Sequence, residues 1–149
     1  MYNKQTNMSI DSEKLFSIFD SSEVNKKLED QRKKLNEFKT TPHFMIGMFI
    51  KYIKNTKYFF ESVKKLLKEE GSIVSLEAQE KVTNRLIFEE SYKCISTINI
   101  SKKDHLKSIQ SFNPHFLHKS LHEAIHYFES EEEYEKCAFL LQIQNKVKI

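Results

Sequence analysis

The sequence predicts an all-α fold, a single compact bundle of six to seven helices with one long central helix over about residues 42–70. First, the 149 residues contain only two glycines, Gly47 and Gly71, and two prolines, too few turn residues for a many-stranded sandwich or barrel. Second, apolar residues recur at helical spacing over most of the chain. The glycine shortage also excludes a glycine-rich phosphate loop, a dinucleotide fingerprint and a nucleophile elbow. The length predicts one domain, over residues 9–149, after a disordered lead of residues 1–8.

The first part of the chain predicts a short helix over Asp11–Phe19 and a longer one over about Ser22–Lys39. Residues 20–23 read Asp-Ser-Ser-Glu, and this capping-box pattern marks the start of the longer helix. Its apolar residues follow one another at spacings of four, seven and three, which predicts a narrow apolar stripe on a charged rod. The stripe consists of Val24, Leu28, Leu35 and Phe38.

The most secure element is the long helix that follows. Thr41-Pro42 supplies a cap and a first-turn proline, and the helix is expected to run to about Glu70, where Gly71 allows a left-handed stop. Such a helix would be about 43 Å long, because each residue adds about 1.5 Å. Its predicted core residues share one half of the helical wheel: Met45, Met48, Phe49, Tyr52, Ile53, Phe59, Phe60, Val63, Leu66 and Leu67.

A fourth helix is predicted over about Leu76–Ser96, with Ser75 as its cap. Because Ile95–Ile100 is rich in β-branched residues, a short strand there is an alternative. Ser101 with Asp104 reads as a capping box for the next helix. The inward candidates of the two segments are Val82, Leu86, Ile87, Ile95, Ile98, Leu106, Ile109 and Phe112.

Two helices are expected to complete the bundle. Asn113-Pro114 repeats the cap-plus-proline start before a helix over Pro114–Glu129, and Ser130 with Glu133 reads as the cap of the last helix. Short connections between such helices are typical of a compact bundle. The predicted core residues of the pair are Leu117, Leu121, Ala124, Ile125, Phe128, Tyr134, Cys137, Ala138, Leu141 and Val147.

Charge is unevenly distributed along the chain. Residues 32–68 contain ten basic and two acidic residues, whereas residues 123–135 contain six glutamates and no lysine or arginine. A basic face on the long helix is the candidate site for a nucleic-acid backbone or a partner, since lysines neutralise phosphates and a tyrosine can stack a base. The alternative is a solvated face. The candidate residues are Lys51, Lys54, Lys57, Tyr58, Lys64, Lys65 and Lys68.

With Arg32 and Arg85 as the only arginines, sequence-specific readout by arginine forks is not expected.

A histidine stripe forms the second candidate face. Its members, spaced three, four and four residues apart, fall within about 80° of one helical face, and Glu129 continues the line. Such a face can bind a divalent metal or respond to pH, and residues 122–126, His-Glu-Ala-Ile-His, have the HExxH spacing of two metal-ligating histidines. No second ligand cluster is visible in the sequence, so we expect no metal. Exposed histidines without a role are the simplest interpretation. The stripe is His115, His118, His122 and His126.

Cys94 and Cys137 match no paired metal or redox spacing and are expected to be buried thiols in a reducing cytoplasm. The first ten residues contain no apolar signal core, and the longest apolar run, Phe44–Ile50, is far shorter than the roughly 20 residues of a membrane span. No cofactor is expected. The abundance of Asn, Ile and Lys is typical of an AT-rich, bacterial or phage coding sequence.

Residues 121–145 carry a pattern seen in one known family. Tyr134-Glu135-Lys136 is followed by Cys137-Ala138-Phe139-Leu140, after an upstream segment in which Leu121, Ala124, Ile125 and Phe128 recur at helical spacing. This segment resembles the UVR motif, a helical hairpin of bacterial excision-repair proteins and some protease adaptors. The Arg-Asp pair common in that motif is replaced here by Leu141-Gln142. The resemblance implies protein–protein docking.

These observations favour a small non-enzymatic interaction protein that binds a protein or a protein–RNA complex. The concrete form is an anti-CRISPR-like inhibitor of a nuclease defence system, because such targets hold RNA beside protein surfaces. A stand-alone RNA- or DNA-binding module that uses the lysine-rich face is the alternative, and a metal-dependent enzyme comes third. No membrane partner is expected, and the sequence does not specify an oligomeric state.

Overall fold

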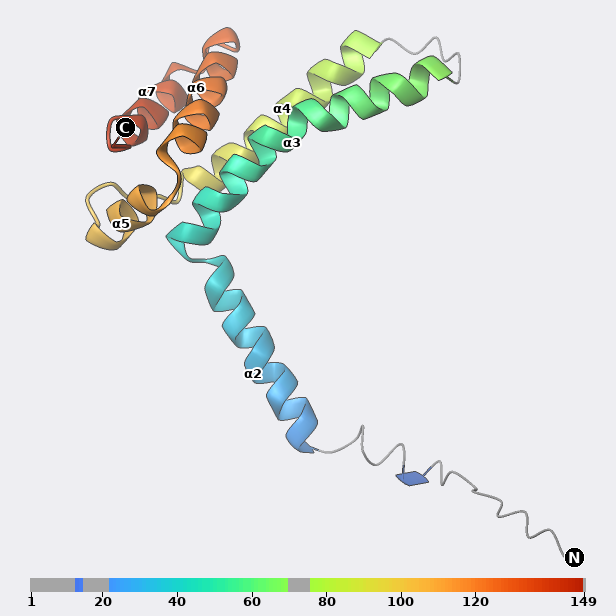
Figure 1. The fold of residues 1–149 in the computed structure, drawn as a ribbon, viewed down its shortest axis with the longest axis vertical. Helices are drawn as coiled ribbons and strands as arrows, with labels where there is room; N and C mark the ends of the chain where they lie inside the picture. Colours follow the sequence, from blue (N-terminus) through green and yellow to red (C-terminus); the bar gives the residue numbers. More distant parts are fainter. Residues whose placement is uncertain (1–12, 15–21, 70–75, 149) are drawn as a thin grey trace, which may run out of the picture. The chain divides into compact units, whose positions relative to one another are not determined.

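The structure is a computed structural model that describes residues 13–14, 22–69 and 76–148. Within these ranges it contains six helices, α2 to α7, and no strand (Figure 1). The predicted all-α class is therefore confirmed. The chain divides into two units, Met1–Lys39 and Thr40–Ile149, so the expectation of a single compact bundle is not confirmed. The predicted disordered lead of residues 1–8 lies outside the described residues. So does the predicted Asp11–Phe19 helix, except for Glu13 and Lys14, which are helical.

The first unit contributes α2, Ser22–Lys39, whose bounds agree with the prediction. None of its residues is buried. The predicted apolar stripe is present and exposed, with 38% of Val24, 47% of Leu28, 52% of Leu35 and 51% of Phe38 accessible to solvent.

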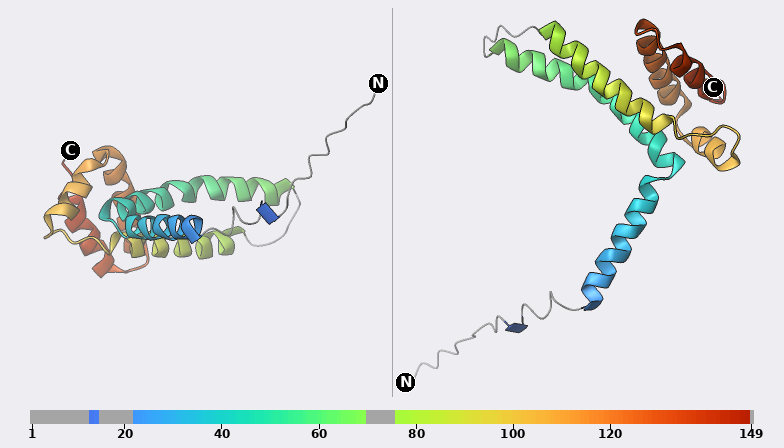
Figure 2. Two further views of the ribbon diagram at one scale, coloured as in Figure 1. Left: turned by 90° about the horizontal axis from the view of Figure 1, so that it is seen from below. Right: turned by 180° about the vertical axis from the view of Figure 1, so that it is seen from behind.

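The second unit is built on α3, Pro42–Glu69, and α4, Leu76–Ile95. With 28 residues, α3 is the longest helix of the described chain, as predicted. The predicted start is confirmed, because the hydroxyl oxygen of Thr41 accepts a hydrogen bond from the amide of Phe44 at 3.3 Å. The two helices lie side by side along much of their length (Figures 1 and 2).

Three shorter helices gather around the end of the α3–α4 pair where α3 begins and α4 ends (Figures 1 and 2). They are α5, Lys103–Ser111, α6, Pro114–Ser130, and α7, Tyr134–Gln144. Both α5 and α6 pack against α3, and α7 packs against α6. The core therefore forms at this end of the unit.

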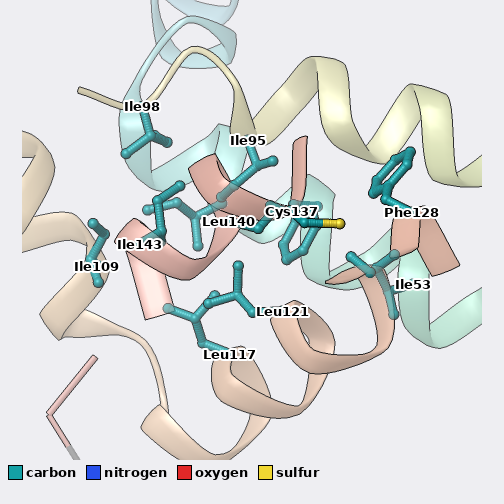
Figure 3. Close-up of a cluster of buried hydrophobic side chains, with 13 residues drawn as sticks. Ile53, Ile95, Ile98, Ile109, Leu117, Leu121, Phe128, Cys137, Leu140 and Ile143 are labelled. Atoms are coloured by element: carbon teal, nitrogen blue, oxygen red, sulfur yellow. The ribbon is translucent and has the colours of Figure 1, made fainter. Parts of the chain in front are cut away.

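The core joins all five helices of the second unit (Figure 3). It also takes Ile98 from the α4–α5 connection, because the chain leaves the helix after Ile95 and turns there. The strand considered over Ile95–Ile100 is therefore wrong. The buried apolar residues are Ile46, Phe49, Ile53, Ile95, Ile98, Ile109, Leu117, Leu121, Ala124, Phe128, Cys137, Leu140 and Ile143.

The predicted core of α3 and α4 is wrong over the outer half of the pair. Phe59 and Leu66 of α3 are 55% and 60% exposed, and Val82 and Leu86 of α4 are 60% and 61% exposed. Two packed helices cover only one face of each other, and α5, α6 and α7 cover the opposite end of the pair. Phe60 is half-buried. The side chains of Val63 and Leu67 lie outside the described residues.

The predicted inner face of α7 is wrong as well. Tyr134 and Leu141 are 64% and 44% exposed, and Ala138 is also exposed. Leu140 and Ile143 are fully buried instead. The buried face of α7 is thus rotated about the helix axis by roughly 100°, the angle between successive residues, from the predicted face. Cys137 is buried and Val147 packs against the core, as predicted.

The predicted caps have mixed outcomes. The side chain of Asn113 accepts hydrogen bonds from the amides of His115 and Phe116 at 3.0 and 3.3 Å, as the Asn-Pro start predicts. The capping box at Ser101 is wrong, because α5 begins after Lys102 with no side-chain cap. The one at Ser130 is wrong too, because this residue still belongs to α6 and its hydroxyl donates to a carbonyl of that helix.

The turn between α6 and α7 has the hydrogen bonds of a Schellman motif. The amide of Glu133 donates to the carbonyl of Phe128 at 2.8 Å, and the amide of Glu132 donates to the carbonyl of Glu129 at 3.1 Å. Glu132 has a φ of 60°, the left-handed conformation that this motif requires and that glycine adopts most easily. A glutamate at this position therefore strains the backbone.

Lys136 ties the α6–α7 hairpin to α4. Its ammonium donates to both carboxylate oxygens of Glu89 at 2.7 and 2.8 Å and forms an ion pair with Glu133. It also lies 4.7 Å from the ring centroid of Phe128 and 5.2 Å from that of Tyr92. Only 20% of the Lys136 side chain is exposed, so this charge is much better shielded from water than an ordinary surface lysine.

Candidate nucleic-acid interface

A groove of about 430 Å³ lies between α3 and α6, inside the second unit. We call it the α3–α6 groove. It joins part of the predicted basic face of α3 to one edge of the predicted histidine stripe of α6. Its lining residues are Ile53, Lys54, Tyr58, Glu61, His115, Phe116, Lys119, Ser120 and Glu123.

Two exposed aromatic rings come from opposite sides of this groove. Tyr58 of α3 is 71% exposed and Phe116 of α6 is 48% exposed. The ammonium nitrogen of Lys54 lies 4.1 Å from the centroid of the Phe116 ring, a distance typical of a cation–π contact. Aromatic rings beside lysines are the combination that binds single-stranded nucleic acids, because bases stack on the rings and lysines attract the phosphates.

The groove itself carries both signs of charge. Lys54 and Lys119 line it together with Glu61 and Glu123. Carboxylates repel phosphates but accept hydrogen bonds from base amino groups. The arrangement therefore suits bases in the groove and a phosphate chain on the lysines around it.

The predicted basic face is present only in part. Lys51, Lys54 and Lys65 are exposed on α3. Lys64 is half-buried, and its ammonium lies 3.2 Å from a carboxylate oxygen of Glu80 on α4, so an acidic partner already compensates its charge. The side chains of the other two predicted lysines, Lys57 and Lys68, lie outside the described residues.

The histidine stripe lies beside the groove. His115 lines the groove and is exposed. The rest of the stripe, with Glu129, is not part of the groove lining; His122, His126 and Glu129 are exposed and His118 is half-buried. Among the described residues, no group of three His, Cys, Asp or Glu side chains is arranged to hold a metal ion. The expected absence of a metal remains a prediction.

The two histidines outside the stripe have structural contacts. The ring of His43 stacks on that of Phe112 with a centroid distance of 4.4 Å, and its Nδ1 lies 3.2 Å from the hydroxyl of Ser111. Nδ1 of His105 accepts a hydrogen bond from the amide of Asn99 at 3.0 Å. These contacts connect α3 to α5 and close the loop before α5.

Both cysteines behave as packing residues. Cys137 is buried, as predicted, whereas Cys94 is only half-buried, so the prediction that both thiols are buried is wrong for Cys94. Burial raises the pKa of the Cys137 thiol, and the nearby Glu129 carboxylate adds to the rise. Burial also raises the pKa of the Cys94 thiol, with a smaller contribution from Glu90. Raised pKa values keep both thiols protonated and poorly nucleophilic at neutral pH.

Of the residues on the α6 side of the groove, sequence reasoning identified only His115. Phe116, Lys119 and Glu123 follow one another at helical spacing, but the sequence alone does not show which face of α6 meets α3. The exposed aromatic Phe116, next to the predicted core residue Leu117, was the available signal.

No helix in the described part of the chain combines the length and the apolar character needed to cross a membrane. Comparison with protein-family models, curated proteins and solved structures found no match to this chain. The resemblance of residues 121–145 to the UVR motif thus remains a prediction.

Proposed function

We propose that this protein is a non-enzymatic helical interaction protein that binds a protein–RNA complex, and that the α3–α6 groove contacts the RNA. The observation that carries the proposal is the pair of exposed rings, Tyr58 and Phe116, facing a groove bordered by lysines. Two exposed rings in one groove fit a ligand with flat apolar faces. The bases of a single strand have such faces.

The charges suggest how a strand would lie. Glu61 and Glu123 in the groove repel phosphates, so the bases would enter the groove and the backbone would follow Lys51, Lys54 and Lys65 on α3. Lysines bind phosphates as point charges without fixing the sequence. We therefore expect binding with little sequence preference.

The form of this function that we favour is an inhibitor of an RNA-containing nuclease complex. Such a target exposes RNA next to protein, so an inhibitor gains affinity from one surface that contacts the RNA and another that contacts the protein. The alternative, a module that binds RNA or DNA alone, requires the groove but no protein partner.

The test is a salt series with a fluorescently labelled single-stranded RNA of mixed sequence and the full chain, measured by fluorescence anisotropy. The variant carries Lys51→Gln, Lys54→Gln and Lys65→Gln together. Each phosphate contact on a single strand contributes about 0.7 to the slope of log K against log salt. The variant should therefore flatten this slope by about two units.

A matched control carries three lysine-to-glutamine changes outside the groove, at the exposed Lys103, Lys107 and Lys148. It lowers the net charge by the same amount, so it separates direct lysine–phosphate contacts from the general attraction between a basic protein and RNA. Tyr58→Ala should weaken binding by about 1–3 kcal/mol, and Tyr134→Ala, an equally exposed tyrosine on α7, should not. Equal slopes for both triple variants, or no RNA binding at low salt, would contradict the proposal.

A further inference from the structure

The apolar stripe of α2 follows a seven-residue repeat. Gln31 fills the gap between Leu28 and Leu35, so the stripe advances by four and three residues in alternation. In the heptad lettering from a to g, Leu28 and Leu35 occupy a positions, and Val24, Gln31 and Phe38 occupy d positions. This repeat is typical of a helix that packs lengthwise against another helix.

Three residues of the stripe are accessible to solvent. Val24, Leu28 and Leu35 expose between 38% and 52% of their surface, and no residue of α2 is buried. A helix of 18 residues is only marginally stable on its own, since most helical stability in proteins comes from packing of an apolar face. A second helix along the stripe would supply that packing.

The residues beside the stripe specify which helix fits. Lys27 and Lys34 occupy the g positions, and Asn25, Arg32 and Lys39 occupy the e positions. Four of these five flanking residues are basic and none is acidic. The acidic residues of α2 lie at b and c positions, farther from the stripe; they are Glu23, Glu29, Asp30 and Glu37.

This charge pattern disfavours pairing with a second copy of α2. In a parallel pair, g residues face e residues of the next heptad, which would bring Lys27 to Arg32 and Lys34 to Lys39. In an antiparallel pair, g faces g and e faces e, which again opposes basic side chains. Charges at these positions select the partner of a coiled coil, and like charges reject it.

We infer that α2 is a docking helix for a partner protein, and that the partner contributes an amphipathic helix with an aliphatic seam flanked by glutamates or aspartates. A polar residue in that seam would face Gln31 and fix the register. The inference goes beyond RNA contact and does not depend on it, because α2 belongs to the other unit of the chain.

Two synthetic peptides of about three heptads serve as probes of this surface. Both carry leucine or isoleucine at a and d except for one asparagine, and they differ only at e and g, where one has glutamate and the other lysine. Binding of each labelled peptide to the full chain is measured by fluorescence anisotropy. The glutamate peptide should bind at least about tenfold more tightly, because four basic flanking residues each contribute a modest ion pair. Its affinity should fall with salt.

Two charge-reversal variants make a matched pair. Lys27→Glu with Lys34→Glu changes the g positions beside the stripe, whereas Lys26→Glu with Lys33→Glu changes the f positions on the opposite side of α2. The net charge changes equally in both. The g variant should lose the preference for the glutamate peptide, and the f variant should keep it within about twofold. Leu35→Asp should reduce binding of the glutamate peptide at least about tenfold, since it puts a charge in the seam.

Three results would overturn the inference. The first is equal affinity for both peptides, or binding of neither, which would mean that basic flanks do not select the partner. The second is an equal effect of the g and f variants. The third is a dimer of the full chain in sedimentation that Leu35→Asp dissociates, which would assign the stripe to self-association. RNA binding by the groove can fail while these results hold, so the two proposals are tested separately.

Discussion

Lys136 offers the sharpest test of what holds the α6–α7 hairpin against α4. We consider Lys136→Met, which keeps an unbranched side chain of similar length and removes the charge. The change deletes two hydrogen bonds to Glu89, the ion pair with Glu133, and the cation–π contact with Phe128. The aliphatic packing of the side chain is largely kept.

The expected loss can be worked out from these contacts. The two carboxylates are about one-third exposed and regain water when the lysine is removed, so each ion pair contributes about 0.5–1 kcal/mol rather than the value of a fully buried pair. The cation–π contact contributes about 0.5–1 kcal/mol more. Lys136→Met should therefore lower the free energy of unfolding by about 2 kcal/mol.

Urea denaturation followed by circular dichroism at 222 nm measures this loss. Lys93→Met is the control, because Lys93 forms an ion pair with Glu90 but is 68% exposed, and surface ion pairs contribute little to stability. A double-mutant cycle with Glu89→Gln should give a coupling energy of about 1 kcal/mol. If Lys136→Met and Lys93→Met destabilise the protein equally, the hairpin is not tied to α4 by this charge.

The contacts of Lys136 also predict that the stability of the protein depends on pH in alkaline solution. Burial opposes the charge of Lys136, but the hydrogen bonds that its ammonium donates to Glu133 and Glu89, together with their negative charges, outweigh burial and raise the pKa of this lysine above its ordinary value of 10.5. Because the pKa of Lys136 is higher in the folded state than in the unfolded state, its charge stabilises the folded protein fully below pH 10.5. This stabilisation is lost as the pH rises through the folded pKa. The stability difference between the wild type and Lys136→Met should thus narrow only in strongly alkaline solution.

Three further substitutions test the fold. Glu132→Gly should stabilise the protein by about 1 kcal/mol in thermal denaturation because glycine adopts the left-handed φ of 60° without strain, whereas Glu131→Gly, at a negative φ, should not. Phe49→Ala should lower the free energy of unfolding in urea by about 3–5 kcal/mol, because the ring is fully buried. Phe59→Ala should lower it by less than about 1 kcal/mol, because that ring is half exposed. Equal losses would show that the core extends along the whole of α3. Gly47→Ala should stabilise the protein by about 0.5–1 kcal/mol, since the added methyl would meet the Phe112 ring at 3.7 Å, an ordinary contact, and alanine favours the helix; destabilisation would show that the ring cannot accept it.

The local signals in the sequence predicted helix starts best where a proline accompanied the cap. Thr41-Pro42 and Asn113-Pro114 begin α3 and α6 as expected, because cap and proline act on their own turn and need no other part of the chain. Ser101 and Ser130 matched a capping pattern without a proline, and both failed as caps. A serine in the last turn of a helix can bond to its own helix, as Ser130 does, so the pattern alone is ambiguous.

The buried face of a helix was harder to predict than the residues at which the helix begins and ends. The short helix α7 carries apolar residues on all sides, so periodicity could not decide between Leu140 and Leu141, and contact with α6 buries the first. Prediction of the α3–α6 groove likewise required knowledge of contacts between distant parts of the chain. Tyr58 and Phe116 are far apart in sequence, and only the packing of α6 on α3 brings them to one surface.

The uneven core of the second unit has a consequence for amide hydrogen exchange. Amides exchange through local opening, and the free energy of opening follows the apolar contacts that must be broken. The inner half of α3, which holds Ile46, Phe49 and Ile53, should exchange only on global unfolding, while the outer half beyond Thr56 should exchange through cheaper partial openings. Tyr58 lies just past this border, opposite Phe116 on the well-packed α6. The part of the α3 wall beyond Thr56 is therefore expected to open more readily than the α6 wall, so a bound ligand should slow exchange mainly in this part of α3.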